Sequence, residues 1–377
     1  MKIAVNARFL IKNKTEGIGR FTFEIFKLLT SRHPEVTFYF LFDRPFSSEF
    51  IFSDNIKPVV LSPPARHPFL WYLWFEISVK RFLKKSGVNI FVSPDGFIPL
   101  NTKMKTLSVI HDLNFEHRPK DIPWLTRTYY KYYFPKFAGR STRIVTVSEF
   151  SKNDIVNNYH VHPDKIDIVH NGVSTMFVPT DIKKQQYIKQ KMTGGKPFFF
   201  YVGAIHQRKN IANLLVSFEQ FCNHSDSEFR MVLTGKSMFG NKKMQSVYKK
   251  MTHKNKVIFT GWLTDKELQQ VMASAYALTF VPYFEGFGIP VIEAMKCGVP
   301  VISSNVTSLP EVAGDAAILV QPDSPVDICN AMLSLANDQS LKNNMISKGL
   351  KNSKQYSWSL AASNMWDSIM KCMNERK

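Results

Sequence analysis

The chain has 377 residues, more than a typical domain of about 100–200 residues, so two domains are expected. Hydrophobic residues make up 44% of the sequence, which excludes a disordered or low-complexity protein. The formal net charge of +19 at pH 7 indicates an anionic partner: a nucleic acid, an anionic membrane surface or a phosphorylated substrate.

The cysteines and the first residues indicate the compartment. Four cysteines lie far apart with no paired spacing, which argues against a disulfide framework or a zinc site and fits a reducing environment. The opening MKIAVNARFL reads as a strand and not as a signal peptide, and no apolar run approaches the ~20 residues that span a bilayer. We therefore expect a cytoplasmic protein that contacts the cytoplasmic face of the membrane peripherally.

Short β-branched and aromatic runs alternate with helical patterns along the chain. In the first half, strands are expected at 2–6, 37–42, 88–92, 106–110, 143–147 and 166–169. In the second half they are expected at 198–202, 229–233, 256–260, 277–281, 299–302 and 316–320. Most are continuous apolar runs, as in parallel sheets covered by helices on both faces. The expected fold class is α/β, with two Rossmann-like, doubly wound parallel-sheet domains facing each other across a cleft.

A polar segment separates the two sets of strands. It covers 178–197 and ends in Gly-Gly-Lys-Pro, so we expect a first domain over 1–180 and a second over 190–356. The final helical pattern, 357–377, is expected to pack back on the first domain.

The positive charge of the first half is concentrated in two aromatic-rich stretches. Residues 1–180 hold 25 Lys and Arg against 15 Asp and Glu, a net +10. Residues 66–85 hold five against one, and residues 118–143 hold seven against one, so together they account for that excess. Such stretches suit an anionic membrane surface and a lipid diphosphate, or they are helices packed on the sheet with solvated lysines.

Two groups of polar residues follow strands of the second half. The strand at 198–202 is followed by Arg208 and Lys209, just before a helical pattern at 211–222 whose N-terminus favours anions. Arg and Lys there suit a diphosphate or form a solvated basic loop. The strand at 277–281 is followed by VPYFEGFGIPVIEAM, with a glycine turn between Glu285 and Glu293. Glycines allow close backbone approach to a ligand, and the alternative is that the acidic residues only stabilise a helix start.

Candidates in the first half are weaker. His111 and Asp112 follow the strand at 106–110, where a histidine is well placed to touch substrate although a lone histidine is often structural. Gly17-x-Gly19 in TEGIGRFT lacks the third glycine of a dinucleotide fingerprint but is a tight turn able to approach a ligand. Ser151-x-x-Asp154 reads as a capping box, beside Glu149 as a candidate acceptor contact. No Asp-x-Asp occurs, so no metal or other cofactor is expected.

Together these residues resemble the retaining glycosyltransferases of family 4, which have the GT-B fold. The resemblance covers nearly the whole chain in order, through Gly17-Ile18-Gly19, His111-Asp112, VSEFSKNDI (147–155), HNGV (170–173), YVGAIHQRKNI (201–211), GWLTDKELQQVMASA (261–275), EGFGIPVIEAMKCGVPVISS (285–304) and LPEVAGDAAILVQP (309–322). It implies sugar transfer from a nucleotide-sugar donor, bound by the second domain, to an acceptor bound by the first.

The resemblance also implies roles for particular residues. Glu285 and Glu293 match the E-x7-E pair that contacts the donor sugar and the ribose. Arg208 and Lys209 match the diphosphate-binding pair, and His111 the histidine beside the reacting sugar. The other donor-site positions implied are Gly19, Gly286, Phe287, Gly288, Ile289, Trp262 and Leu263.

The N-terminal pattern and the stretch at 127–152 look most like bacterial mannosyltransferases of surface polysaccharide assembly. GDP-mannose is therefore the expected donor, with UDP- and dTDP-sugars as alternatives, and a saccharide or polyprenyl-diphosphate-linked saccharide is the expected acceptor. A non-catalytic nucleotide-sugar-binding protein and a basic nucleic-acid-binding protein are the other hypotheses. The second lacks a recognised reader motif, so nucleic acid is not an expected partner.

Overall fold

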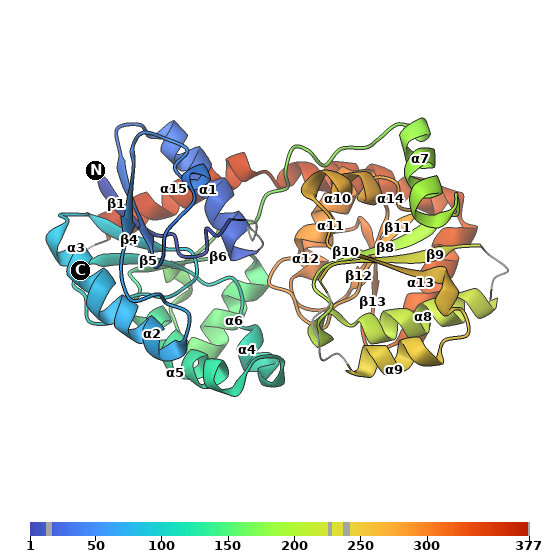
Figure 1. The fold of residues 1–377 in the computed structure, drawn as a ribbon, viewed down its shortest axis with the longest axis horizontal. Helices are drawn as coiled ribbons and strands as arrows, with labels where there is room; N and C mark the ends of the chain where they lie inside the picture. Colours follow the sequence, from blue (N-terminus) through green and yellow to red (C-terminus); the bar gives the residue numbers. More distant parts are fainter. Residues whose placement is uncertain (13–16, 225–227, 237–241, 376–377) are drawn as a thin grey trace. The chain divides into compact units, whose positions relative to one another are not determined.

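The computed structural model describes residues 1–12, 17–224, 228–236 and 242–375. It divides into two compact units (Figure 1). The first comprises Met1–Gly172 and Trp358–Lys377, and the second comprises Val173–Ser357. Thr15 and Glu16, which open the glycine turn expected at 15–22, lie outside the described residues.

The first unit is built on a seven-stranded sheet with the order β3-β2-β1-β4-β5-β6-β7. Every neighbouring pair is parallel. The strands are β1 (Lys2–Asn6), β2 (Thr37–Phe42), β3 (Ile56–Val60), β4 (Ile90–Ser93), β5 (Lys105–Val109), β6 (Arg143–Thr146) and β7 (Ile166–Ile168). Since side chains alternate across a strand, Ala4 faces one layer of helices while Ile3 and Val5 face the other, and all three are fully buried.

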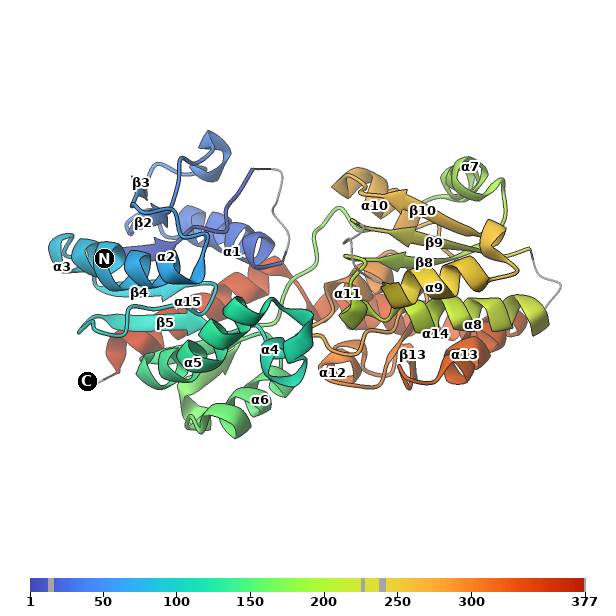
Figure 2. The ribbon, with the colours of Figure 1, turned by 60° about the horizontal axis from the view of Figure 1, so that its bottom comes forward.

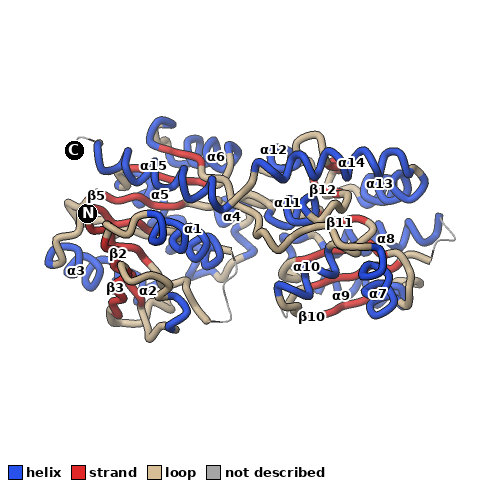
Figure 3. Tube along the Cα trace, turned by 90° about the horizontal axis from the view of Figure 1, so that it is seen from above, coloured by secondary structure: helices blue, strands red, loops and turns tan. Residues whose placement is uncertain are grey.

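Helices cover both faces of this sheet (Figures 1 and 3). One layer holds α1 (Ile18–Arg32) and α15 (Trp358–Asn374), which pack together, with α15 also against β5 and β6. The opposite layer, in front in Figure 2, holds α2 (Pro68–Leu73), a π-helical turn (Trp74–Val79), α3 (Lys80–Lys85), α4 (Asn114–His117) and α5 (Trp124–Arg140). The short helix α6 (Glu149–Tyr159) leads into β7.

The second unit is built on a six-stranded parallel sheet with the order β10-β9-β8-β11-β12-β13. Its strands are β8 (Phe198–Val202), β9 (Arg230–Thr234), β10 (Val257–Gly261), β11 (Ala277–Phe280), β12 (Val301–Ser304) and β13 (Ala317–Val320). One layer holds α8 (Ile211–His224), α9 (Lys242–Lys250) and α13 (Pro325–Asn337), and the other α7 (Ile182–Thr193), α10 (Asp265–Met272), α11 (Ile289–Lys296), α12 (Leu309–Ala313) and α14 (Gln339–Asn352) (Figure 1).

The strand orders position the candidate sites. Each sheet has a switch point where the order reverses, between β1 and β4 in the first unit and between β8 and β11 in the second. In open parallel sheets, ligands bind outside the carboxyl ends of the strands at such points. The segments that follow β8 and β11 are therefore where the second unit would hold a ligand.

The predicted fold class, two doubly wound parallel α/β sheets, is confirmed. All twelve expected strands are present within one or two residues of the expected bounds. The sequence missed β3, an edge strand whose central residue is Pro58 and which is mostly exposed. A proline and an exposed pattern are tolerated at a sheet edge but hide a strand from a search for buried runs.

The segment 178–197, expected to separate two domains, contains the helix α7 and belongs to the second unit. The side chain of Asp181 caps α7 by accepting a hydrogen bond from Lys184 N at 2.8 Å. The chain passes between the units earlier, between Gly172 and Val173, and returns between Ser357 and Trp358. The segment therefore lies between the two sets of strands, as expected, but it is largely a polar surface helix of the second unit.

Candidate active site

The loop after β8 is fastened to the loop after β11. Asn210, in the left-handed conformation at φ 61°, is buried and donates hydrogen bonds to Val281 O at 2.9 Å and Pro322 O at 2.7 Å. Tyr283 N donates to Arg208 O at 2.9 Å. These bonds hold a short 3-10 helix, Gln207–Lys209, beside the segment that carries Glu285.

Three ionisable side chains form one cluster at this edge of the sheet. Arg208 Nη1 lies 2.9 Å from Glu285 Oε1, and Lys209 Nζ donates to the same oxygen. Arg208 Nη1 also donates to Phe284 O at 2.6 Å. The side chains of Arg208, Lys209 and Glu285 are only 23%, 13% and 13% exposed, so the cluster is shielded from bulk water.

The charges of this cluster control the ionisation of Glu285. Burial alone would raise the pKa of the Glu285 carboxyl, but the charges and hydrogen bonds of Lys209 and Arg208 outweigh it and lower that pKa. Glu285 is therefore a carboxylate at neutral pH. An ionised carboxylate only accepts hydrogen bonds, which suits it to sugar hydroxyls.

The glycine turn after Glu285 begins α11. Gly288 is the residue before this helix, at φ 101°, and a Cβ there would lie 2.5 Å from Leu309 Cδ2. Only glycine fits that position, because both the backbone conformation and the space exclude a side chain. Pro290 lies in the first turn, where its missing N–H costs nothing. Val291 N donates to Gly288 O at 3.0 Å and Pro290 has no N–H, but the positive end of the helix dipole still favours an anion here.

Two residues that the sequence did not single out hold this turn. Ser308 Oγ donates to Glu285 O at 2.9 Å and to Phe287 O at 3.2 Å. Glu285 N donates to Thr307 Oγ1 at 3.3 Å, and Thr307 has a φ of 58°. The visible signal was their place directly before the LPEVAGD motif at 309–315.

The remaining candidates of the second unit lie along the same edge. Glu293 is half-buried and lies one turn into α11, eight residues after Glu285. Trp262 and Leu263 follow β10, and the Trp262 side chain is 55% exposed. The second unit therefore brings Arg208, Lys209 and Glu285 into direct contact, and it places Glu293, Trp262 and Leu263 on neighbouring elements.

In the first unit, His111 follows β5. Its Nε2 lies 2.8 Å from Pro94 O, and its ring meets that of Phe21 edge-on at 5.0 Å. A carbonyl only accepts, so Nε2 carries the proton and Nδ1 of the neutral ring is an acceptor. Burial lowers the pKa of His111, against the raising effects of Pro94 O, Asp112 and Asp95, so the ring is neutral at pH 7.

The other first-unit candidates occupy local structural positions. Asp112 Oδ1 accepts from Asn114 N at 2.9 Å, and Asp112 is half-buried. Glu149 is exposed as the first residue of α6. Gly19 is buried in the first turn of α1, which Gly17 precedes at φ 54°.

The capping box expected at Ser151-x-x-Asp154 is wrong. The residue that caps α6 is Ser148, whose side chain accepts from Ser151 N at 3.1 Å. Asp154 lies inside the helix and contacts His117 Nε2 at 2.7 and 2.9 Å. Ser151 Oγ donates instead to His111 O at 3.1 Å, which helps to fix the loop after β5.

A buried ion pair that the sequence did not reveal lies at the switch point of the first sheet. Arg8 Nε is 2.5 Å from Asp95 Oδ2, with side chains 5% and 2% exposed. The Arg8 guanidinium also lies over the Phe97 ring at 4.3 Å. The pair follows β1 and β4, and Asp95 is among the charges that act on His111.

Two features are absent from the part of the chain that the structure describes. No helix among them is both long and apolar enough to cross a bilayer. In the same part of the chain, no group of three or more His, Cys, Asp or Glu side chains is arranged to hold a metal ion.

Comparison with known proteins gives the family. The model of Glycosyltransferase Family 4 matches residues 15–177, and that of Glycosyl transferases group 1 matches residues 183–352. O-antigen chain mannosyltransferase B from Escherichia coli is 27% identical over 275 residues, which cover 71% of each chain.

Two solved structures share the fold. Sucrose-phosphate synthase from Thermosynechococcus elongatus superimposes with a TM-score of 0.80 at 15% identity, covering 98% of each chain. HepE from Anabaena, in complex with UDP and glucose, gives a TM-score of 0.78 at 13% identity, covering 98% of this chain and 100% of HepE. At such identity the likeness is one of fold, the GT-B fold.

Proposed function

Since the chain belongs to the group 1, family 4 glycosyltransferases, which are retaining enzymes that use nucleotide-sugar donors, we propose that it transfers mannose from GDP-mannose to a saccharide acceptor. The observation that carries the proposal is the Arg208–Lys209–Glu285 cluster at the switch point of the second sheet. It combines two cations for a diphosphate with one carboxylate for a sugar.

The chemistry of sugar transfer explains the cations. Breaking the anomeric bond leaves a nucleoside diphosphate with growing negative charge and a sugar of oxocarbenium character. Arg208 and Lys209, with the N–H groups that open α11, stabilise that charge where it develops. These groups take the part that a metal plays in other transferases, so we propose a reaction that needs no metal.

Glu285 holds the donor sugar in this proposal. Its carboxylate is kept ionised by the two cations, so it accepts hydrogen bonds from sugar hydroxyls. Ser308 and Thr307 fix the backbone of Glu285, and a fixed backbone keeps the acceptor oxygens in place. The N–H groups of Phe287, Gly288 and Ile289 serve the sugar and the phosphate.

The nucleoside is held by flanking residues. Glu293, half-buried on α11, binds the ribose, and Trp262 and Leu263 lie near the base. The family resemblance adds Gly19, in the first turn of α1, as a candidate diphosphate contact.

His111 takes part as a neutral group. With its proton on Nε2, held by Pro94 O, its Nδ1 accepts a hydrogen bond from the reacting sugar or its acceptor. It orients the sugar and does not attack it. Retention then follows from attack on the same face as the leaving phosphate, which itself accepts the proton of the acceptor hydroxyl.

The donor is chosen from the relatives. The E. coli relative is named an O-antigen chain mannosyltransferase, which favours GDP-mannose, whereas HepE was solved with UDP and glucose, which keeps a UDP-sugar as the alternative donor. A dTDP-sugar is a third. The acceptor that fits a role in surface polysaccharide assembly is a saccharide or a polyprenyl-diphosphate-linked saccharide, with Asp112 and Glu149 as candidate contacts.

The two basic, aromatic stretches have a divided role. Their buried rings, Trp74, Phe75, Phe134 and Phe137 among them, belong to the core of the first unit. Other side chains of α2 and α5 are exposed: Phe69 by 64%, Tyr72 by 40%, Trp124 by 67% and Tyr132 by 57%. Exposed aromatic rings among lysines suit the interface of an anionic membrane, so we propose peripheral contact there.

A donor panel tests the proposed function. The full chain is incubated with GDP-mannose, UDP-sugars and dTDP-sugars in the presence of a chelator and a membrane extract as acceptor source. Nucleoside diphosphate release is expected with GDP-mannose. If only a UDP-sugar releases its nucleoside diphosphate, the donor is that UDP-sugar and not GDP-mannose. Release from none of the donors would contradict the transferase proposal.

A further inference from the structure

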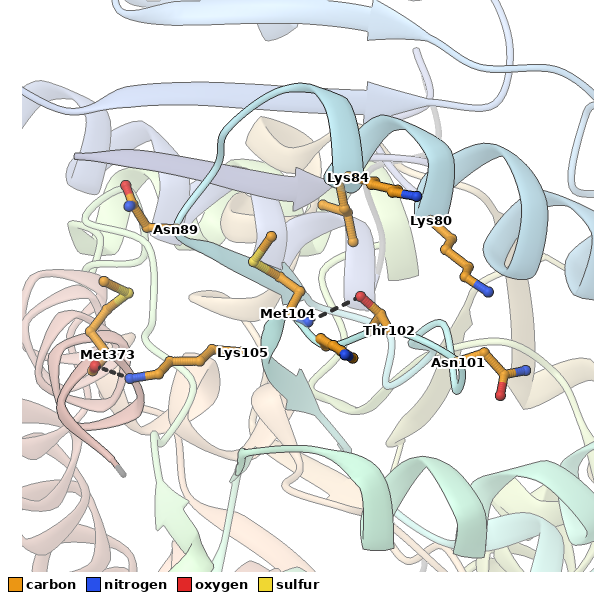
Figure 4. A pocket seen from close by; sticks show the side chains of 10 residues that line it. Lys80, Lys84, Asn89, Asn101, Thr102, Met104, Lys105 and Met373 are labelled. Atoms are coloured by element: carbon orange, nitrogen blue, oxygen red, sulfur yellow. Dashed lines mark hydrogen bonds between the residues drawn. The ribbon is translucent and has the colours of Figure 1, made fainter. Parts of the chain in front are cut away.

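A cavity lies in the first unit, away from the proposed donor-binding residues. Its volume is about 620 Å³. It is lined by α3, by the residue before β4, by the segment that leads into β5 and by the end of α15: Lys80, Leu83, Lys84, Asn89, Asn101, Thr102, Lys103, Met104, Lys105 and Met373 (Figure 4). The lining therefore holds four lysines and no carboxylate.

The cavity is at the opposite end of the sheet from His111. It opens at the amino ends of β4 and β5, while His111 follows the carboxyl end of β5. At about 3.3 Å per residue, Lys105 and His111 are roughly 20 Å apart along the strand. The lining shares Lys80, Leu83 and Lys84 with the basic stretch at 66–85, but it contains no residue proposed for donor or acceptor binding.

Within the described part of the chain, three of the lysines have no ion-pair partner. Lys105 Nζ donates to the carbonyl of Met373, which anchors it (Figure 4). For Lys80, Lys84 and Lys103, no ion pair or hydrogen bond of the ammonium group is found among the residues that the structure describes. Lys80 extends from α3 toward the loop that carries Asn101 and Thr102 (Figure 4). Lys80 is half-buried, Lys84 and Lys103 are exposed, and all three line the hollow. Like charges around one hollow repel, so an anion that binds there lowers their mutual repulsion.

A carboxylate close in sequence does not neutralise them. Glu76 accepts hydrogen bonds from Leu100 N and from the backbone and side-chain amide of Asn101, and it does not line the cavity. These bonds hold the loop at 100–101 against the preceding helical turn. The lysines are thus presented by a fixed loop and a helix.

The size and the lining define the ligand. A volume of about 620 Å³ lies within the range of about 300–1,000 Å³ typical of small-molecule sites and exceeds the ~30 Å³ of one water about twentyfold. Leu83, Met104 and Met373 supply apolar surface beside the ammonium groups. We propose that this cavity binds a phosphate-bearing anion with an organic portion, either a soluble phosphate ester or a lipid headgroup.

Methionine methyl resonances provide a local test. The full chain is labelled with [¹³C-methyl]methionine, the signals of Met104 and Met373 are assigned by Met→Leu substitution, and inorganic pyrophosphate is added. Saturable shifts of both signals are expected. Pyrophosphate also suits the Arg208–Lys209 pair, so the titration is repeated with the Arg208→Ala, Lys209→Ala double variant. Shifts of Met104 and Met373 that persist in this variant belong to the cavity, so failure of the proposed function would not imitate failure here.

A triple substitution, Lys80→Gln, Lys84→Gln and Lys103→Gln, is expected to weaken the affinity at least about tenfold. The matched control is Lys183→Gln, Lys184→Gln and Lys354→Gln, three exposed lysines of the second unit, which should change it less than about twofold. Lys103→Glu alone, in the exposed loop, serves as a second variant with minimal risk to folding.

Vesicles distinguish the two sources. Flotation is measured with phosphatidylglycerol vesicles and with phosphatidylcholine vesicles. If the triple variant loses recruitment to phosphatidylglycerol and pyrophosphate competes with the vesicles, the ligand is a lipid headgroup. If the triple variant loses only pyrophosphate binding, the ligand is soluble. The proposal is overturned if the three substitutions alter neither pyrophosphate binding nor vesicle recruitment.

Discussion

Glu285→Ala is the substitution with the most distinctive expected result. It removes the oxygen that Arg208 Nη1 contacts at 2.9 Å and that Lys209 Nζ also contacts. Both cations then lose their counter-charge while remaining largely shielded, at 23% and 13% exposure. The sugar loses its carboxylate at the same time, although the groups proposed for the diphosphate remain.

The magnitudes follow from this geometry. Removing one partner of a buried ion pair costs about 3–5 kcal/mol. Because these side chains keep some contact with water, we expect a loss of about 2–3 kcal/mol in the free energy of unfolding. Turnover should fall at least ~100-fold, as when a group that acts in the transition state is removed. Affinity for free GDP should stay constant or rise, since the Glu285 carboxylate no longer competes with the diphosphate for Arg208 and Lys209.

Urea unfolding measures the stability of the variant, calorimetric titration measures its affinity for GDP, and a rate assay measures its turnover with GDP-mannose. Glu285→Gln is the matched control, because it keeps the shape and an acceptor oxygen while removing the charge. A near-normal turnover of Glu285→Ala would contradict the proposed role of Glu285 in holding the sugar. A fall in GDP binding as large as the fall in turnover would also contradict it, since the carboxylate would then only hold the two cations in place.

The remaining predictions concern the turn, the histidine and the cap. Gly288→Ala should lower the free energy of unfolding by about 1–3 kcal/mol, because the added methyl group is crowded and the backbone there is strained for alanine. Gly139→Ala is the control: its methyl group would have no neighbouring atom within 4 Å, so the change should be neutral or stabilising. Thermal unfolding of the two variants compares these effects. Burial lowers the pKa of His111, so the unfolded chain binds a proton at this residue more readily than the folded chain, and the free energy of unfolding should fall as the pH drops through 6.5. His111→Gln should lower this pH dependence, measured by urea unfolding at pH 5.5 and 7.5. An unchanged pH dependence in the variant would contradict the proposed burial effect. Ser148→Ala should destabilise the chain by about 1 kcal/mol through loss of the α6 cap, and no change in the midpoint would argue against that cap.

The pattern of strands was predictable because it is local. Buried parallel strands are continuous apolar runs, and most of the twelve expected strands carried that signal. The edge strand β3 did not, since Pro58 and its exposed neighbours resemble a loop. The helix α7 was missed for a similar reason: its exposed, lysine- and glutamine-rich surface reads as a linker.

The candidate site was predictable in its residue types but not in its contacts. The positions of Arg208, Lys209 and Glu285 after strands placed them on one edge, yet their joint ion cluster depends on the packing of β8 beside β11. The support of Glu285 by Ser308 depends on a contact 23 residues apart. The Arg8–Asp95 pair joins residues 87 apart, at the ends of β1 and β4. No spacing rule along the chain reveals such pairs.

The most direct test of the central claim is nucleoside diphosphate release from GDP-mannose in EDTA, measured for the intact chain and for the Arg208→Ala, Lys209→Ala double variant. We expect release by the intact chain with a metal chelator present, and a loss of at least ~100-fold in the double variant. Equal rates in both proteins would show that the cluster after β8 and β11 does not carry the reaction.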